Sequence, residues 1–548
     1  MGQVLENLSK QKLRGGYYTP QPITEFLCNW CIQQNTKNVL EPSCGDGNFI
    51  EAAILRFKEL GVVGEDLKGR LKGIELIEEE SIKAKSRAAN LGLNSNTIEN
   101  NDFFHYLSNN GKVKYDAVLG NPPFIRYQNF PEEHRKLAIE MMQNLGLNPN
   151  KLTNIWVPFL VISASLLNEN GRMAMVIPAE LFQVKYAAET RVFLSKFFER
   201  ITIVTFKKLV FANIQQEVVL LLCEKKVNHG KGIRVIECEN LEDLKSINFK
   251  SINGSNVKAI DHSTEKWTKY FLEENEIALL KKLRKDKRVI SCSDIMEVDV
   301  GLVTGRNEFF MLKEDQVKQW KLKPYTIPVA SKSNQLKGIT FSETDFSENS
   351  KAQNSIHLFI PPNEDFEKLP KVCQKYIEYG EQQGFNTGYK TRIRKRWYIT
   401  PSLWVPDAFA LRQVGDYPKL VLNETGASST DTIHRVRFKD GVDRNLVAIS
   451  FFNSLSFAFS EITGRSYGGG VMTFEPTEIE EIQMPRLADL PIDFDRIDAL
   501  IRKRKVKEVL DIVDEALLVN HHGFKKEEVA VMRGIWKKLS QRRINRKK

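Results

Sequence analysis

The nine residues from Asp116 to Phe124 constrain the fold of this 548-residue chain more than any other segment. They open with an apolar run that predicts a β-strand, and the strand must stop at Gly-Asn-Pro-Pro, because neither Pro122 nor Pro123 has an N–H to donate to a neighbouring strand. Asn121 is thereby held on a stiff turn. Its side-chain oxygen, the Pro122 carbonyl and the following aromatic ring predict a site for a planar amino group, such as the exocyclic NH2 of an aromatic base.

The same residues also suit an ordinary turn followed by a core aromatic residue, but the upstream sequence favours a binding site. Residues 38–50 read as a short apolar strand, a loop of small residues and the start of a helix, in which Gly45 and Gly47 let the backbone pass close to a ligand. The Gly-x-Gly spacing lacks the third glycine of the dinucleotide fingerprint. Glu41 and Asp46 would also repel a polyanion, so a pyrophosphate is not the expected guest.

Two more acidic residues follow at corresponding positions. A second apolar strand, residues 71–77, contains Glu75, and an acidic residue at the end of the second strand of a doubly wound sheet typically binds ribose hydroxyls. Asp102 lies in residues 101–104, just before the next predicted helix, where it could bind an adenine amino group. Together with the acidic loop after the first strand, these residues fit one cationic ligand that contains adenosine.

The order of these segments resembles the gamma class of S-adenosylmethionine-dependent amino-methyltransferases, and within it the TaqI-like adenine-N6 DNA methyltransferases. Residues 45–47, Glu75, Asp102 and residues 121–124 look like motifs I to IV of that class, and Gly-Tyr-Tyr-Thr-Pro at residues 16–20 looks like its motif X. The order X, I, II, III, IV followed by a long C-terminal region argues against classes in which the Asn/Asp-Pro-Pro motif comes first.

The resemblance extends to about residue 224. Residues 151–167 look like motif V, in which Phe159 would pack against the cofactor adenine. Residues 210–211, before an apolar strand, look like motif VIII, in which Phe211 would stack on the target base. Both rings would also suit an ordinary core. Phe124 stands where many relatives have Tyr, which removes a hydroxyl but keeps the stacking face.

The resemblance implies S-adenosylmethionine as the cofactor and no metal. The expected cofactor-binding residues are Thr19, Glu41, Ser43, Gly45, Asp46, Gly47, Glu75, Asp102, Phe103 and Phe159. The expected catalytic residues are Asn121, Pro122 and Phe124. Hydrogen bonds from the adenine N6 protons to Asn121 and to the Pro122 carbonyl would localise the nitrogen lone pair for in-line attack on the methyl group. Because N6 is inaccessible inside a duplex, the base must be flipped out, and Phe124 and Phe211 would clamp it.

Beyond residue 232 the sequence is less informative. Residues 300–310 and 327–334 resemble the opening of target-recognition domains in related methyltransferases, residues 392–398 interleave cations with aromatics, and residues 464–470 form a Gly-rich stretch. The expected substrate-binding residues are Pro123, Phe211, Arg394, Arg396, Trp397, Arg465 and Tyr467. The basic ones also suit a solvated strand or a tight turn.

Charge is concentrated at the C-terminus. Of the formal net charge of +11, residues 501–548 contribute +9, from 15 Lys/Arg and 6 Asp/Glu. This tail reads as helices, whose cations would either bind phosphates or form a solvated face. We expect a doubly wound, Rossmann-like α/β catalytic domain in residues 1–230, a mixed α/β DNA target-recognition domain in residues 231–490, and a basic helical segment in residues 491–548.

The predicted function is a site-specific adenine-N6 DNA methyltransferase that acts on a flipped adenine in double-stranded DNA, as the modification component of a restriction-modification system. We expect a monomer in the cytoplasm of a prokaryote, without a membrane segment, that acts alone or is partnered by a separate restriction endonuclease. One alternative is an RNA guanine-N2 or protein glutamine methyltransferase, although such enzymes usually lack motif X and so long a C-terminal region. Another is an inactive DNA-binding subunit, which the intact motif set disfavours. The recognition sequence is not predictable from the chain.

Overall fold

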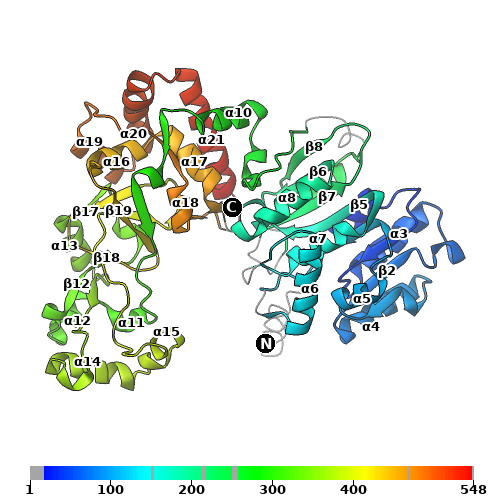
Figure 1. Cartoon of the computed structure of the whole chain (residues 1–548), viewed down its shortest axis with the longest axis horizontal. Coiled ribbons are helices and arrows are strands. Elements are labelled where there is room, and N and C mark those ends of the chain that lie inside the picture. Colours follow the sequence, from blue (N-terminus) through cyan, green and yellow to red (C-terminus); the bar gives the residue numbers. More distant parts are fainter. Residues whose placement is uncertain are drawn as a thin grey trace. The chain divides into compact units, whose positions relative to one another are not determined.

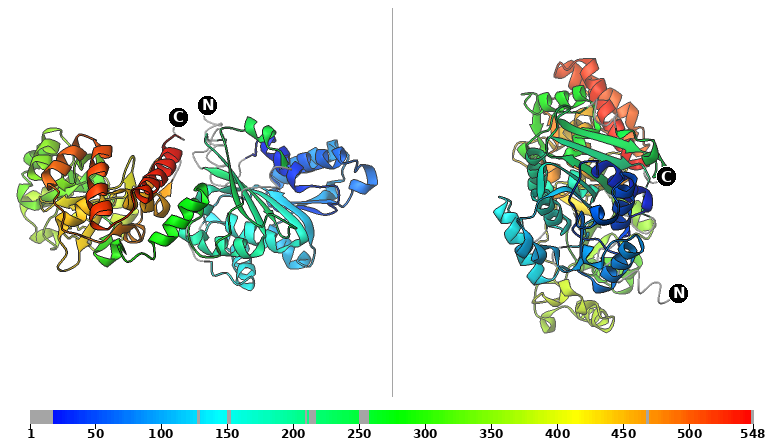
Figure 2. Two further views of the ribbon diagram at one scale, coloured as in Figure 1. Left: turned by 90° about the horizontal axis from the view of Figure 1, so that it is seen from above. Right: turned by 90° about the vertical axis from the view of Figure 1, so that its right-hand side faces the viewer.

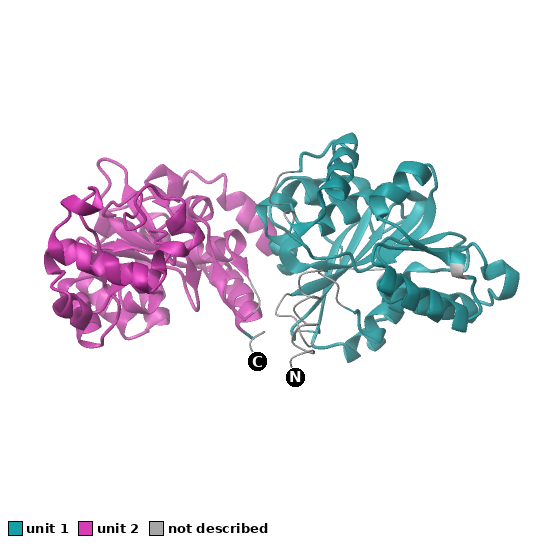
Figure 3. Cartoon of the chain, turned by 90° about the horizontal axis from the view of Figure 1, so that it is seen from below, with its two compact units in different colours: residues 1–274, 545–548 teal, residues 275–544 magenta. Residues whose placement is uncertain are grey.

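The computed structural model describes residues 18–126, 129–149, 153–208, 210–211, 217–249, 257–466 and 469–545. The chain divides into two compact units, with the boundary after Glu274 (Figure 3). Unit 1 holds the N-terminal half, and unit 2 comprises residues 275–544. Both contain sheets and helices, which agrees with the expected mixed α/β classes.

Unit 1 is built on an eight-stranded sheet with the strand order β3-β2-β1-β4-β5-β7-β6-β8. The strands are β1 (Val39–Glu41), β2 (Leu71–Glu75), β3 (Ile98–Asn100), β4 (Tyr115–Gly120), β5 (Leu167–Pro178), β6 (Arg200–Phe206), β7 (Val218–Glu224) and β8 (Gly232–Cys238). Neighbouring strands from β3 to β5 are parallel, with Val39 of β1 opposite both Leu71 of β2 and Ala117 of β4. β7 is antiparallel to both of its neighbours.

Seven helices with described bounds accompany this sheet (Figures 1 and 2). They are α2 (Gln21–Cys31), α3 (Asn48–Glu59), α4 (Glu78–Asn90), α5 (Phe103–Asn110), α6 (Glu132–Asn144), α7 (Trp156–Ser165) and α8 (Ala188–Phe197). They pack side by side in two series, α2 to α4 and α5 to α8. α7 is apolar on all sides and almost wholly buried, as expected of a helix in the core of a layered domain.

The strand order fixes where a ligand can bind. The chain passes from β1 outward to β2 and β3, then returns to the other side of β1 with β4 and continues to β5. The connections therefore diverge between β1 and β4. In open α/β sheets a crevice forms at this switch point, outside the carboxyl ends of the strands. The loops that follow Glu41 and Gly120 flank that crevice.

The first unit extends beyond the domain boundary that we expected at residue 230. β8 begins at Gly232 and pairs in parallel with β6 along its whole length, from Arg200 opposite Gly232 to Phe206 opposite Cys238. The polar, Gly-containing stretch before it is thus a connection between strands of one sheet. Such a stretch suits a tight connection as well as a domain linker, so its composition does not distinguish the two.

Unit 2 contains four smaller sheets. Their strand orders are β10-β19-β15-β17-β13, β11-β14-β12-β18, β16-β21-β20 and β22-β9. The strands are β9 (Val289–Ser291), β10 (Met296–Asp299), β11 (Met311–Leu312), β12 (Thr326–Ala330), β13 (Thr340–Phe341), β14 (His357–Phe359), β15 (Ala408–Leu411), β16 (Gln413–Val414), β17 (Leu420–Asn423), β18 (Ser428–Ser429), β19 (Ile433–Phe438), β20 (Arg465–Ser466), β21 (Met472–Thr473) and β22 (Gln483–Pro485).

The helices of this half of the chain are short, except near the C-terminus. They are α10 (Glu274–Leu283), α11 (Asn307–Phe310), α12 (Glu314–Gln319), α13 (Glu343–Lys351), α14 (Lys371–Gln382), α15 (Tyr389–Arg392), α16 (Arg444–Phe451), α17 (Ser454–Thr463), α18 (Pro476–Glu480), α19 (Phe494–Arg502), α20 (Val506–Val513) and α21 (Lys526–Ile544). A π-helix, Asp514–His521, connects α20 toward α21. In the described ranges no single helix is long and apolar enough to cross a bilayer, and α16 with α17 reaches that size only as a pair bent by 76°.

Three arginines of the basic C-terminal segment help to hold unit 2 together through ion pairs. Arg543 of α21 is 2% exposed at its side chain and pairs with Glu461 of α17 at 2.9 Å. Arg502 forms ion pairs with Asp345 and Asp498, and Arg533 binds Asp514 at 2.7 Å. These cations therefore serve intramolecular ion pairs, an outcome that neither the solvated-face nor the phosphate-binding interpretation anticipated.

Candidate functional site

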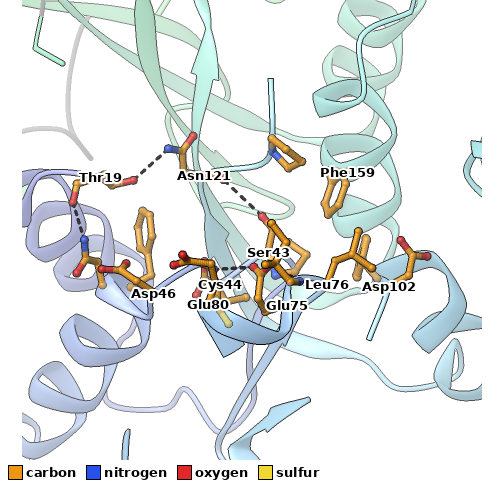
Figure 4. A pocket seen from close by; sticks show the side chains of 18 of the residues that line it. Thr19, Ser43, Cys44, Asp46, Glu75, Leu76, Glu80, Asp102, Asn121 and Phe159 are labelled. Atoms are coloured by element: carbon orange, nitrogen blue, oxygen red, sulfur yellow. Dashed lines mark hydrogen bonds between the residues drawn. The ribbon is translucent and has the colours of Figure 1, made fainter. Parts of the chain in front are cut away.

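A pocket of about 170 Å³ opens at the carboxyl ends of β1, β2 and β4, where the strand order places the crevice (Figure 4). Its lining consists of Tyr18, Thr19, Glu41, Pro42, Ser43, Cys44, Gly45, Asp46, Asn48, Phe49, Glu75, Leu76, Ile77, Glu80, Asn101, Asp102, Phe103, Asn121, Pro123, Ile125, Phe130 and Phe159. Of the ten expected cofactor residues, nine lie in this set and only Gly47 does not. Asn121 joins them from the end of β4, so one pocket combines the expected cofactor residues with the expected catalytic amide.

The loop after β1 turns sharply enough that two of its positions use left-handed backbone. Gly45 has φ +53° and Gly47 has φ +93°. A Cβ on Gly47 would lie 2.9 Å from the Cα of Ala84, so α3 and α4 approach each other here as closely as glycine allows. Gly47 therefore shapes the loop from behind, which explains why it does not line the pocket.

Glu75, at the end of β2, fixes this loop from the other side. Its Oε2 accepts a hydrogen bond from the Gly45 N–H at 2.8 Å, and its Oε1 accepts one from the Ile77 N–H at 2.8 Å. Burial raises the pKa of the Glu75 carboxyl, and these two N–H donors oppose the rise. A carboxylate oxygen has two lone pairs, so Glu75 can organise the loop and still accept ribose hydroxyls from the pocket side.

Carboxyl groups dominate the charged lining. Glu41 is 1% exposed, and its Oε2 is buried without a hydrogen-bond partner among the described residues. Burial raises the pKa of Glu41 well above its usual range, and the negative charges of Glu75 and Asp46 raise it further. Asp46 is partly neutralised, because Arg87 Nη2 of α4 binds it at 2.8 Å. This lining suits a cationic guest and disfavours an anionic one.

Apolar rings gather at one end of the pocket. Phe103 and Phe159 stack with ring centroids 5.2 Å apart and 19° between their planes. Asp102 lies beside them, and its Oδ1 accepts the His105 N–H at 2.9 Å, which caps α5. Figure 4 shows Asp102 and Phe159 at one end, Thr19 and Asp46 at the other, and Glu75 between them. An apolar slot with a carboxylate suits adenine, and a polar end suits an amino-acid group.

The carboxamide of Asn121 is oriented by a hydrogen bond inside the pocket. Its Nδ2 donates to the Thr19 Oγ1 at 3.1 Å, and the Ser43 hydroxyl donates to its backbone carbonyl at 3.4 Å. Thr19 itself is 4% exposed, and its carbonyl accepts from Asn48 Nδ2 at 3.3 Å. With the amide nitrogen directed at Thr19, the side-chain oxygen is directed away from it (Figure 4).

The other residues of the Asn-Pro-Pro-Phe turn are distributed around this amide. Pro123 lines the pocket, whereas Pro122 is buried and Phe124 is half-buried. Phe124 packs against a hydrophobic cluster that also contains Phe211. Phe211 is only 7% exposed. Its burial favours the core interpretation for Phe211 over the stacking role.

Sequence reasoning missed several lining residues. Tyr18 donates its hydroxyl to both carboxyl oxygens of Glu80 on α4, at 3.2 Å each, and so closes one side of the pocket. Tyr18 belongs to the same motif as Thr19, residues 16–20, so its position directly before Thr19 could have identified it as a lining residue. Ile125 directly follows the Asn-Pro-Pro-Phe motif, which is a similar signal, whereas nothing in the local sequence of Glu80 or Phe130 indicates that they line this pocket. Residues Gly16 and Tyr17 of the same motif lie outside the described residues.

The expected DNA-contacting residues of unit 2 are mostly occupied within the unit. Arg396 binds Asp365 at 2.7 Å, and Trp397 Nε1 donates to Glu381 Oε1 at 2.9 Å. Arg465 binds Glu478 at 2.9 Å, with its side chain 18% exposed. Arg394 Nη2 donates to the Val303 carbonyl at 2.8 Å. Tyr467 lies outside the described residues. These side chains therefore have partners within unit 2, and their binding of DNA stays a prediction.

The fold and the pocket together define a class I S-adenosylmethionine-dependent methyltransferase. The pocket has an apolar slot beside Asp102, the carboxylate of Glu75 at a strand end and an otherwise acidic lining, which suit an adenine, a ribose and a sulfonium, so its residues fit this cofactor. Two sequence families then match the chain. The family described as Eco57I restriction-modification methylase covers residues 52–211, and the family described as Type II methyltransferase M.Eco57I, C-terminal domain, covers residues 264–518. The chain is a restriction-modification DNA methyltransferase of the gamma class.

Similar proteins cover nearly the whole chain. The Type II methyltransferase M.AccI of Acinetobacter calcoaceticus is 25% identical over 541 residues, which span 94% of this chain and 92% of the relative. M.XamI of Xanthomonas campestris pv. amaranthicola is 20% identical, spanning 87% and 86%. Among solved structures, the Type IIL restriction-modification enzyme MmeI, determined with DNA, has a TM-score of 0.58 at 12% identity and spans 95% of this chain and 75% of its own. That likeness confirms the fold.

Proposed function

We propose that this chain methylates N6 of adenine in double-stranded DNA. The observation that carries the proposal is the fixed carboxamide of Asn121, at the edge of a pocket suited to S-adenosylmethionine. Nδ2 donates to Thr19 Oγ1, which directs Oδ1 away from Thr19 as a hydrogen-bond acceptor for an exocyclic amino group. The Pro122 carbonyl supplies the second acceptor that such a group needs.

The chain's residues contribute by positioning and polarisation. S-adenosylmethionine supplies an electrophilic methyl group when bound. The adenine N6 lone pair is delocalised into the ring. Hydrogen bonds that its two N–H groups donate to Asn121 Oδ1 and to the Pro122 carbonyl favour a nitrogen whose lone pair faces the pocket. Phe124 would hold the base face. No strong general base is required of the chain, because transfer of the methyl group from sulfur to N6 would leave a neutral thioether and a cationic nitrogen, whose proton is acidic enough to pass to solvent.

The target adenine must leave the helix to reach this pocket, so the proposal includes base flipping. The pocket lies at the ends of strands β1, β2 and β4, and N6 of a stacked, paired adenine is blocked by its partner base. We assign ring stacking to Phe124, because Phe211 is buried in the core cluster. Unit 2 is proposed as the target-recognition domain, because its family match and its basic, aromatic segment fit that role.

We also propose that the protein acts as the modification component of its system, with a separate restriction endonuclease and as a monomer. Its type II relatives support the assignment, since M.AccI is matched over 92% of its length. The bacterial source of those relatives agrees with the expected location, the cytoplasm of a prokaryote.

Transfer of labelled methyl groups tests the proposal. Purified protein is incubated with tritiated S-adenosylmethionine and either duplex DNA, total RNA or a protein extract, and the products are digested and separated. We expect label in N6-methyladenine from DNA, and a decrease of about 100- to 1,000-fold for Asn121→Ala, comparable to the loss of a preorganised polar group in other active sites. Label in guanine of RNA, in glutamine, or in a cytosine would refute the proposed target atom.

A further inference from the structure

Helix α15 of unit 2 and the turn after it hold two large apolar side chains in solvent. Tyr389 is 66% exposed and Ile393 is 60% exposed, more than any other large apolar side chain of the described residues. The Ile393 N–H donates to the Tyr389 carbonyl at 3.3 Å, so the backbone continues as a helical turn. Residues four apart on a helix lie on one face. The two side chains therefore form a single apolar projection.

The same segment is strongly and uniformly basic. The 25 residues from Gln382 to Pro406 contain five Lys or Arg and no Asp or Glu. Lys390, Arg392 and Lys395 are exposed. The apolar projection is thus flanked by cations and has no acidic neighbours along the chain. Such a surface is complementary to a polyanion that also offers apolar surface.

Buried contacts on the opposite side of this segment keep Tyr389 and Ile393 exposed. Thr391 lies between Tyr389 and Ile393 in the sequence, but its side chain is fully buried. Its Oγ1 lies 2.9–3.1 Å from the carbonyl oxygens of Phe385, Asn386 and Gly388. The ion pair of Arg396 with Asp365 follows in sequence. These contacts fix the rotation of the segment, so Tyr389 and Ile393 cannot turn inward without breaking them.

A neighbouring loop is fitted against the helix. Gly305 has φ +81°, and a Cβ there would lie 2.8 Å from the Lys390 Cβ. Val303 of this loop is 40% exposed, and its carbonyl accepts a hydrogen bond from Arg394. The two unit 2 segments that the sequence singled out, residues 300–310 and 392–398, therefore meet at this projection.

We propose that Tyr389 and Ile393 form a wedge that enters duplex DNA at a base step, while Lys390, Arg392 and Lys395 bind the flanking phosphates. Apolar side chains inserted between base pairs unstack them and bend the duplex, and neighbouring cations hold the backbone in place. The aromatic ring of Tyr389 stacks on a base face, and Ile393 fills the opened step. This inference rests on the proposed function in that DNA is the substrate.

Three variants of the full-length protein separate the wedge from the phosphate contacts. The wedge variant is Tyr389→Ala/Ile393→Ala, and the cation variant is Lys390→Ala/Arg392→Ala/Lys395→Ala. Ile82→Ala of unit 1 serves as the matched control, because Ile82 is 59% exposed and lies outside the pocket. Binding of duplex DNA is measured from 50 to 300 mM salt, and bending is measured by energy transfer between dyes at the duplex ends. Binding of S-adenosylmethionine reports that each variant is folded.

We expect the wedge variant to lose the bend and to bind about 10- to 100-fold more weakly with an unchanged salt slope. The cation variant should keep the bend, and its slope of log K against log salt should fall in magnitude by about 2.7, since each phosphate contact contributes about 0.9. A wedge variant that bends and binds DNA like the wild type overturns the inference, as does a wild-type protein that does not bend DNA. Binding to anionic vesicles, lost in the wedge variant while DNA bending persists, would assign the projection to a membrane surface instead.

Methylation of the same duplexes distinguishes the two proposals. If the wild type bends DNA through Tyr389 and Ile393 but modifies no adenine, the proposed function fails and the wedge stands. If it methylates adenine and the wedge variant bends normally, the wedge fails and the function stands.

Discussion

Replacement of Thr19 by Val tests whether its hydroxyl orients the Asn121 carboxamide, the proposed catalytic group. Val has nearly the same shape, which suits a side chain that is 4% exposed, but it cannot accept the hydrogen bond that Asn121 Nδ2 donates at 3.1 Å. Without that acceptor the carboxamide is less firmly oriented, and it can present an N–H to the adenine amino group. A single hydrogen bond contributes about 1–1.4 kcal/mol, which corresponds to a decrease of about 5- to 10-fold in the rate of methyl transfer.

Single-turnover kinetics at saturating DNA and S-adenosylmethionine measure that rate directly. We expect Thr19→Val to lower it while the Kd for S-adenosylmethionine changes less than about twofold, and we expect Thr19→Ser, which keeps the hydroxyl, to restore it. In the Asn121→Ala background the Thr19→Val change should have no further effect, because the two residues act through one contact. A loss of cofactor affinity with an unchanged rate would refute this reasoning and return Thr19 to the cofactor-holding role expected from the sequence.

Three more perturbations follow from the geometry. Because burial raises the pKa of Glu41, that carboxyl keeps its proton to a higher pH in the free protein than an exposed glutamate does, and a bound sulfonium favours its ionisation. We therefore expect the affinity for S-adenosylmethionine to rise with pH below the raised pKa, with proton release in calorimetry that Glu41→Gln abolishes. An affinity independent of pH would contradict this. In urea titrations, Gly47→Ala should lower the free energy of unfolding by about 1–3 kcal/mol, because its new Cβ would meet Ala84. Gly45→Ala should lower it by only about 1 kcal/mol, because its Cβ meets nothing within 4 Å; equal losses would show that the Ala84 contact is unimportant. Arg543→Met should destabilise the protein by about 3–5 kcal/mol, because it leaves the Glu461 carboxylate buried without its ion-pair partner. The double variant Arg543→Met/Glu461→Leu should recover most of that loss, and a double variant no more stable than Arg543→Met would refute the pairing argument.

The sequence predicted the pocket well because its residues follow strand ends. Glu41, Glu75 and Asn121 each terminate or follow an apolar run, and parallel strands bring such positions to one edge of the sheet. The same holds for α20, in which Val506, Val509, Leu510 and Val513 recur at helical spacing; the last three are buried and Val506 is half-buried. In these cases the information is local, and the fold only has to align the strands.

The sequence predicted less where a side chain's partner is remote. Arg396 and Arg465 read as DNA-facing cations, yet Asp365 and Glu478 bind them. Composition reveals a charge but not the carboxylate that the fold brings to it. The β8 strand was assigned to the second domain for a similar reason, because its partner β6 lies about thirty residues earlier and strand pairing leaves no local signature.

The measurement that tests the account most directly is single-molecule sequencing of genomic DNA from a methylation-deficient host that expresses this chain, beside the Asn121→Ala variant at equal expression. The account predicts N6-methyladenine at one defined sequence motif in the first sample and its near-absence in the second. Methylated cytosine at a motif, or N6-methyladenine that persists in the Asn121→Ala variant, would contradict the central claim that Asn121 directs methyl transfer to an adenine amino group.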